Sequence, residues 1–147
     1  MNRYITNQKG LTLIELLAAI SIFAIIVGLV YGVLINGINY SNIAQTKTAL
    51  QQEANYVITM TRSQHQNSGY ESYQIDIGEN LTSINIGEHE INNPNINYTV
   101  EALRNGEVEL AENDLIDPHQ PLYIHLIVTD ARNDQHSFEI RTTIRRL

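Results

Sequence analysis

The strongest constraint on this chain is a long apolar stretch near its N-terminus. Residues 16–46 carry no charged side chain, and residues 16–35 are almost all apolar. About 20 such residues in a helix cross the hydrocarbon core of a bilayer, so residues 16–35 predict a transmembrane helix. One carboxylate, Glu15, stands at the entrance to this stretch. A carboxylate next to hydrocarbon is costly without a partner, so Glu15 indicates a functional group.

The residues before the apolar stretch follow a specific pattern. Residues 9–15 read KGLTLIE, behind a short leader that contains Arg3 and Lys9 and no acid. This arrangement resembles the N-terminus of type IV prepilins and pseudopilins, in which a basic leader and a glycine precede the cut and Phe-Thr-Leu-x-Glu and an apolar helix follow it. The chain departs from that pattern at Leu11, an apolar residue where most relatives have Phe. The resemblance covers roughly residues 1–45.

The resemblance implies a processing site and an assembly residue. A prepilin peptidase would cut between Gly10 and Leu11, and the new Leu11 amine would be methylated. Glu15 lies four residues further on, about one helical turn. In a filament it would pair with the cationic Leu11 amine of a neighbouring subunit and so fix the axial register. The alternative for Glu15 is an interfacial carboxylate without a partner.

Charge and pattern together predict three segments. Positive charge before the first span stays in the cytoplasm, so the rest of the chain is expected to face outward. We expect a leader peptide at 1–10, a transmembrane and assembly half of a helix at 11–38, and an amphipathic half-helix with a head domain at 39–147. A plain membrane anchor explains the span and the orientation, but it gives no reason for Gly10 and Glu15.

Three glycines interrupt the apolar helix. Gly28 and Gly32 lie four residues apart on one helix face, which is either a tolerated spacing or a surface for close helix approach. Gly32 and Gly37 soften the helix, because glycine costs about 1 kcal/mol relative to alanine there. We expect this segment to stretch or melt in an assembled fibre.

Beyond residue 40 the pattern becomes amphipathic and then alternates. One apolar stripe recurs at helical spacing; its members are Ile43, Leu50, Ala54, Val57 and Thr61. After Gly69 the period changes to two, and we predict about six strands, at 73–77, 81–86, 97–103, 108–111, 122–129 and 137–145, with loops at 87–94 and 112–120. The Asn105-Gly106 pair predicts a tight hairpin. The predicted fold is α+β, a long N-terminal helix whose second half packs on an antiparallel sheet, as in pilins.

Composition narrows the chemistry. The chain has no cysteine and a formal net charge of -7, so it forms no disulfide, and its acidity argues against direct DNA binding by this subunit. No catalytic or phosphate-binding signature is present, so we predict neither an enzyme nor a cofactor. The five histidines, of which His125 falls in a predicted strand, lack metal-ligand spacing. Residues 112–117 form an acidic loop that is either solvated or a calcium site.

These observations favour a minor pilin or pseudopilin that is processed and assembled through its apolar helix. The resemblance implies the following partners: other pilins or pseudopilins, a prepilin peptidase/N-methyltransferase, an inner-membrane assembly platform, and lipid before assembly. It leaves open a competence pilus, a type IV pilus or a type II secretion pseudopilus. The alternative is a membrane-tethered extracellular binding or sensing domain that does not assemble.

Overall fold

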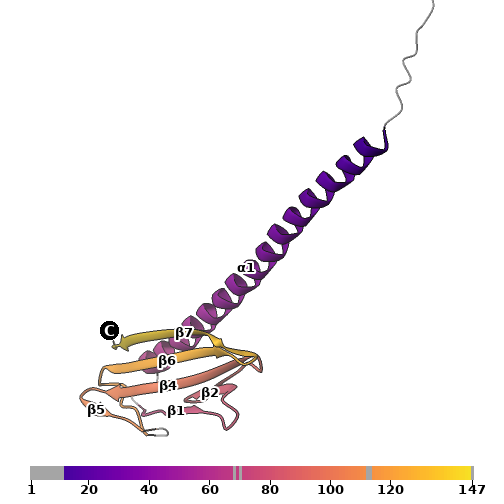
Figure 1. Ribbon diagram of the computed structural model, residues 1–147. Helices are drawn as coiled ribbons and strands as arrows, with labels where there is room; N and C mark the ends of the chain where they lie inside the picture. Colours follow the sequence, from indigo (N-terminus) through magenta and orange to yellow (C-terminus); the bar gives the residue numbers. More distant parts are fainter. Residues whose placement is uncertain (1–11, 68, 70, 112–113, 147) are drawn as a thin grey trace, which may run out of the picture. The chain divides into compact units, whose positions relative to one another are not determined.

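The structure, a computed structural model, describes residues 12–67, 69, 71–111 and 114–146. It divides after Asn42 into two compact units. Within these described residues, one long helix is followed by seven strands; Figure 1 shows the course of the chain. They are α1 (Leu13–Asn67), β1 (Ile75–Ile77), β2 (Ser83–Ile86), β3 (His89–Asn92), β4 (Ile96–Asn105), β5 (Val108–Glu109), β6 (Leu122–Asp130) and β7 (Asn133–Ile144).

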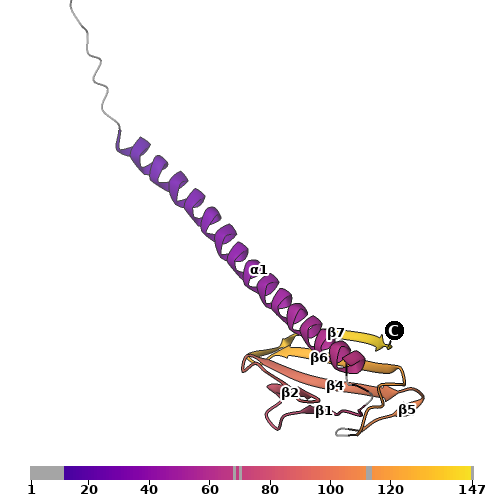
Figure 2. The ribbon, with the colours of Figure 1, turned by 180° about the vertical axis from the view of Figure 1, so that it is seen from behind.

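The strands form two antiparallel sheets. One has the order β1-β2-β3, and the other has the order β5-β4-β6-β7. Figures 1 and 2 show β4, β6 and β7 side by side with the last turns of α1 near them. The predicted α+β fold, a long apolar N-terminal helix with antiparallel sheet, is therefore confirmed, with seven strands in two sheets in place of about six in one.

The predicted loop at 87–94 is wrong, because it contains β3. Ile86 pairs with His89 across a two-residue turn of Gly87 and Glu88. Gly87 has a φ of +59°, and a Cβ there would come within 2.7 Å of the Gln64 side chain on α1. Only glycine fits such a turn without strain. The polar segment His89–Asn92 therefore turns back along β2 and forms the strand β3 at one edge of its sheet.

The core lies between the C-terminal half of α1 and the strands. On the helix the predicted stripe is buried from Leu50 to Thr61, whereas Ile43 remains exposed at 38%. On β6 every second residue is fully buried; these are Leu122, Ile124, Leu126 and Val128. The alternating face of β6 and the helical stripe thus cover each other, as the two periodicities require.

Two buried tyrosines connect α1 to the sheets. The Tyr98 hydroxyl on β4 donates to Glu53 Oε1, and Asn93 Nδ2 donates to Glu53 Oε2 at 3.4 Å. Burial and the Glu53 carboxylate raise the pKa of Tyr98, so it remains a donor. The Tyr73 hydroxyl lies 2.9 Å from His65 Nδ1 at the end of α1. These two contacts position the C-terminal part of α1 against the rest of the head.

The hairpin predicted at Asn105-Gly106 is present, but its turn is shifted by one residue. Asn105 pairs with Val108, so the two turn residues are Gly106, with a φ of +66°, and Glu107. The Asn105 side chain instead holds the backbone of Asp117. Its Nδ2 donates to the Asp117 carbonyl at 2.9 Å, and its Oδ1 accepts from the Asp117 amide at 2.7 Å.

The burial of His65 leads us to expect that the stability of the fold decreases in acid. The His65 side chain is fully buried, and this burial is the main reason that its pKa lies below 6.5. The backbone of Gln120 and the charge of Asp117 raise the pKa, whereas the charge of Arg146 lowers it further. A lowered folded-state pKa means that the unfolded chain binds the proton more readily. Stability is therefore full above about pH 6.5 and falls as the pH drops below it, by at most about 1.4 kcal/mol per pH unit.

The measurement is the urea midpoint of the full chain at pH 7.5 and pH 5.5. We expect His65→Asn, whose amide can still meet Tyr73, to lose less stability between these pH values than the wild type. Equal losses in the two proteins would assign the acid sensitivity to other groups.

Candidate membrane and assembly segment

The first part of α1 exposes a continuous apolar surface. Among the described residues, one helix is long and apolar enough to cross a membrane. In its most apolar stretch of 18 residues, no residue is buried by the rest of the chain. The exposed side chains include Leu16, Leu17, Ile20, Phe23, Ile26, Leu29, Val30 and Leu34. Such a surface in water would be strongly unfavourable, so it requires lipid or other helices as its surroundings.

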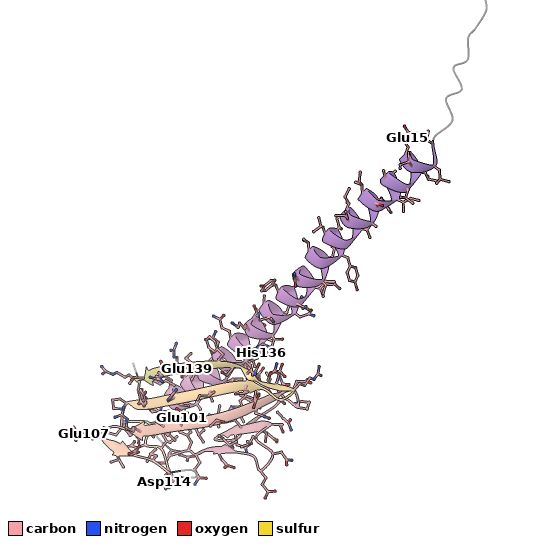
Figure 3. All side chains as sticks on the ribbon, in the orientation of Figure 1. Glu15, Glu101, Glu107, Asp114, His136 and Glu139 are labelled. Atoms are coloured by element: carbon pink, nitrogen blue, oxygen red, sulfur yellow. The ribbon has the colours of Figure 1, made fainter. Side chains whose placement is uncertain are left out.

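Glu15 takes part in the structure that begins this helix. Thr12 Oγ1 accepts from the Glu15 amide at 3.3 Å, while Glu15 Oε2 accepts from the Thr12 amide at 2.9 Å and from the Thr12 hydroxyl at 2.8 Å. This reciprocal pair is a capping box. Figure 3 shows Glu15 at the first turn of α1. The capping box gives the carboxylate a defined place within its own chain.

The capping box leaves part of the Glu15 carboxylate available. Both bonds from Thr12 end on Oε2, and no hydrogen bond to Oε1 is present among the described residues. A second donor, such as an ammonium group, can therefore approach without breaking the cap. The role of Thr12 was not predicted from the sequence, although the spacing Thr-x-x-Glu before an apolar run is the signature of a capping box.

The other predicted site residues divide into two groups. Gly10 and Leu11, the predicted cleavage pair, lie outside the described residues. Gly28, Gly32 and Gly37 all lie within the unbroken helix α1, and a Cβ on any of them would meet nothing within 4 Å. Within one chain these glycines are therefore not required by close packing.

The polar side chains of the head form small clusters that contain Glu and His residues. Among the described residues, no group of three His, Cys, Asp or Glu side chains is arranged to hold a metal ion. In the acidic loop, Asp114 Oδ2 accepts from the Ala111 amide at 2.8 Å, and residues 112 and 113 lie outside the described part. His125 is buried between two carboxylates, with Nδ1 at 3.2 Å from Glu101 and Nε2 at 3.3 Å from Glu139.

Comparison with known families supports a class of protein for the N-terminal segment. The family model described as the prokaryotic N-terminal methylation motif matches residues 5–31. With the apolar helix and its Glu15, this match supports a protein of the type IV prepilin or pseudopilin type, a class that is typically structural rather than enzymatic. The same features are consistent with a membrane-anchored protein. Searches of curated proteins and of solved structures found no match.

Proposed function

We propose that this chain is a minor pilin or pseudopilin of a type IV-like filament, in a competence pilus, a type IV pilus or a type II secretion system. The observation that supports this most is the capped Glu15 at the start of an uncovered apolar helix, inside the matched motif. A carboxylate in that position is stabilised when a cation reaches it in a low-dielectric setting. The Leu11 amine of a neighbouring subunit would be that cation.

The proposed sequence of events is mechanical. The leader, residues 1–10, stays on the cytoplasmic side, because its basic residues precede the span. A prepilin peptidase/N-methyltransferase cuts after Gly10 and methylates Leu11. The segment 11–38 holds the subunit in lipid until an assembly platform extracts it, and residues 39–147 form the extracytoplasmic head. Assembly then exchanges lipid for the apolar helices of other pilins, which cover the surface that the single chain leaves exposed.

The N-terminus of the mature protein tests this proposal. Mass spectrometry of the chain from cells with an active prepilin peptidase should show Leu11 as the first residue, with a methyl group on its amine. The control is the same chain in cells that lack the peptidase, where residues 1–10 should remain. An uncut chain in the presence of the enzyme would favour the alternative, a membrane-tethered binding or sensing domain.

The glycines predict local softness of the assembled helix. Replacing Gly32 and Gly37 together with alanine should stabilise the helix by about 1 kcal/mol at each site, because nothing in the chain opposes the added Cβ atoms. In filaments, backbone amides near these positions should then exchange hydrogen more slowly than in the wild type. Unchanged exchange would show that the glycines do not determine how far this segment opens.

A further inference from the structure

The two edges of the four-stranded sheet carry opposite charge. Residues 101–117, which contain β5, hold six acidic side chains and one basic one, whereas residues 131–147, which contain β7, hold four arginines and two acids. Figure 3 shows Glu107 on the side of β5 and Glu139 and His136 on the side of β7. β5 and β7 are the two outermost strands of this sheet. The sheet therefore has an acidic edge at β5 and a basic edge at β7.

The exposed side chains at the β5 edge suit a basic partner. Glu107 and Glu109 are exposed, and neither has an ion-pair partner among the described residues. Between them, Val108 is 63% exposed. A hollow of about 260 Å³ opens beside Glu109, with Leu81 and Leu103 among its apolar walls and Glu101 also lining it. An apolar side chain flanked by open carboxylates matches a strand that carries arginines around an apolar residue.

The β7 edge carries that pattern. Near its C-terminal end, Ile144 lies between Thr143 and the exposed Arg145, and Arg141 is exposed two residues before Thr143. Among the described residues, β7 pairs with β6 alone. An unpaired strand edge offers amide and carbonyl groups for pairing with another chain.

The backbone groups of both edges point outward at matching positions. The Tyr98 amide donates to the Leu81 carbonyl, on the side of β4 that faces away from β6. The backbone groups of its partner Val128 therefore point toward β7, and those of Phe138 point back toward β6. Because backbone groups alternate in direction along a strand, Thr143 is directed outward.

At β5, the Leu110 amide bonds to the Leu103 carbonyl. The neighbouring residue Glu109 therefore faces outward by the same alternation. Thr143 and Glu109 are thus an outward-facing pair of positions, one on each edge.

The strand registers predict how the edges meet. Glu109, Arg104, Tyr123 and Thr143 are successive partners across the sheet. If a second copy continues the sheet without a shift, Thr143 of one copy therefore lies opposite Glu109 of the next. In that register, Arg145 faces Glu107, and Ile144, whose side chain is buried in the core of its own head, lies beside Val108. Glu109, opposite Thr143, has Arg141 and Arg145 as its diagonal neighbours, within the reach of long side chains.

We propose that the C-terminal end of β7, residues 141–145, adds as a strand to β5 of a second copy of this chain. The contact joins two different edges, so it is heterologous and can repeat without closing. Every copy keeps the same orientation, and the segments 43–67 of α1 remain parallel. This proposal rests on the proposed function, since a membrane or a polar filament requires parallel subunits.

Pairing of two β7 edges with each other is less favourable. It would relate the copies by a two-fold axis perpendicular to the sheet and reverse the direction of one 43–67 segment. That reversal conflicts with the parallel subunits that the proposed function requires. A β7–β7 contact would also leave Val108 and the β5 carboxylates uncovered.

Disulfide crosslinking tests the contact in the full chain, which has no cysteine of its own. Opposed residues in a hydrogen-bonded antiparallel pair have Cα atoms about 5.5 Å apart, which suits a disulfide. The double variant Glu109→Cys/Thr143→Cys, oxidised in intact membranes, should give a ladder of dimers, trimers and larger species. Each single variant should give no ladder, and an equal mixture of the two should stop at dimers. The matched control Glu109→Cys/Asp134→Cys places its second thiol at the far end of β7 and should give no ladder.

Charge exchange supplies an independent measurement in the same background. Glu107→Arg or Arg145→Glu alone should reduce the ladder about fivefold or more, and the two together in one chain should restore it. A dimer from Thr143→Cys alone, or crosslinks to other proteins only, would overturn the proposal. Processing at Leu11 is read by mass spectrometry from the same sample. A processed chain without a ladder would therefore refute this contact alone, while a ladder from an unprocessed chain would count against the proposed function.

Discussion

Replacing Glu15 with alanine is expected to remove the subunit from sheared filaments while its amount in the membrane stays the same. The apolar helix inserts without Glu15, because insertion depends on the apolar residues that follow. In a filament, the neighbouring Leu11 amine would lose its counter-charge in a low-dielectric setting, which costs several kcal/mol. We therefore expect at least a tenfold loss from the filament fraction, measured by immunoblotting of sheared and membrane fractions.

Two further variants separate the charge of Glu15 from its capping role. Glu15→Gln retains a side chain that suits the capping box but removes the charge. Thr12→Val removes the Oγ1 acceptor and donor but retains the carboxylate. If Glu15 functions by pairing with an amine, the Glu15→Gln variant should be lost from filaments like Glu15→Ala, and the Thr12→Val variant should assemble almost normally. Recovery of Glu15→Gln at wild-type levels would assign Glu15 to helix capping, and equal recovery of Glu15→Ala would remove it from assembly altogether.

Local pattern was sufficient to predict the helix and most strands. The uncharged stretch and the stripe that ends at Thr61 are both helical signals, and the alternation from Leu122 to Val128 can be satisfied only by a half-buried strand. The same stripe extends one step further, to His65, four residues after Thr61. The predicted stripe ends at Thr61, although the spacing alone places His65 on the buried face.

The division into two sheets could not be predicted from the sequence. Strand alternation says which face of a strand is buried, but not which strand becomes its neighbour, because pairing depends on contacts distant in the chain. β3 was missed for a related reason. Its single buried residue, Ile91, gives no periodic signal, and its strand form depends on pairing with β2 and on the turn at Gly87.

The local geometry around Glu15 was not predicted from the sequence. The position of Glu15 before an apolar run predicts a functional role, which stays a prediction, whereas the bonds to Thr12 show how the carboxylate is held within the chain. The charge difference between β5 and β7 became visible only with the sheet order, because residues 101–117 and 131–147 become opposite edges through the pairing of β4, β6 and β7.

Replacing Leu126 with alanine is expected to destabilise the head strongly. Leu126 is fully buried on β6, between Val100 of β4 and Ile140 of β7. Truncating a buried leucine costs about 2–5 kcal/mol, through lost burial and the cavity left behind. A domain of this size has a total stability of about 5–15 kcal/mol, and without cysteines no disulfide limits the loss.

The measurement for this last variant is the urea concentration at which a brief protease pulse cleaves half of the full chain. With a urea dependence of about 1–3 kcal/mol per molar, Leu126→Ala should lower the midpoint by roughly 1–3 M. The matched control is Ile127→Ala, which removes a partly buried side chain from the next position on the opposite face of β6 and should shift the midpoint by less than half as much. Equal shifts would mean that the face of β6 toward the helical stripe is not the one that holds the head together. In cells, the loss should appear as fewer subunits reaching the filament, because partly unfolded heads are degraded before assembly.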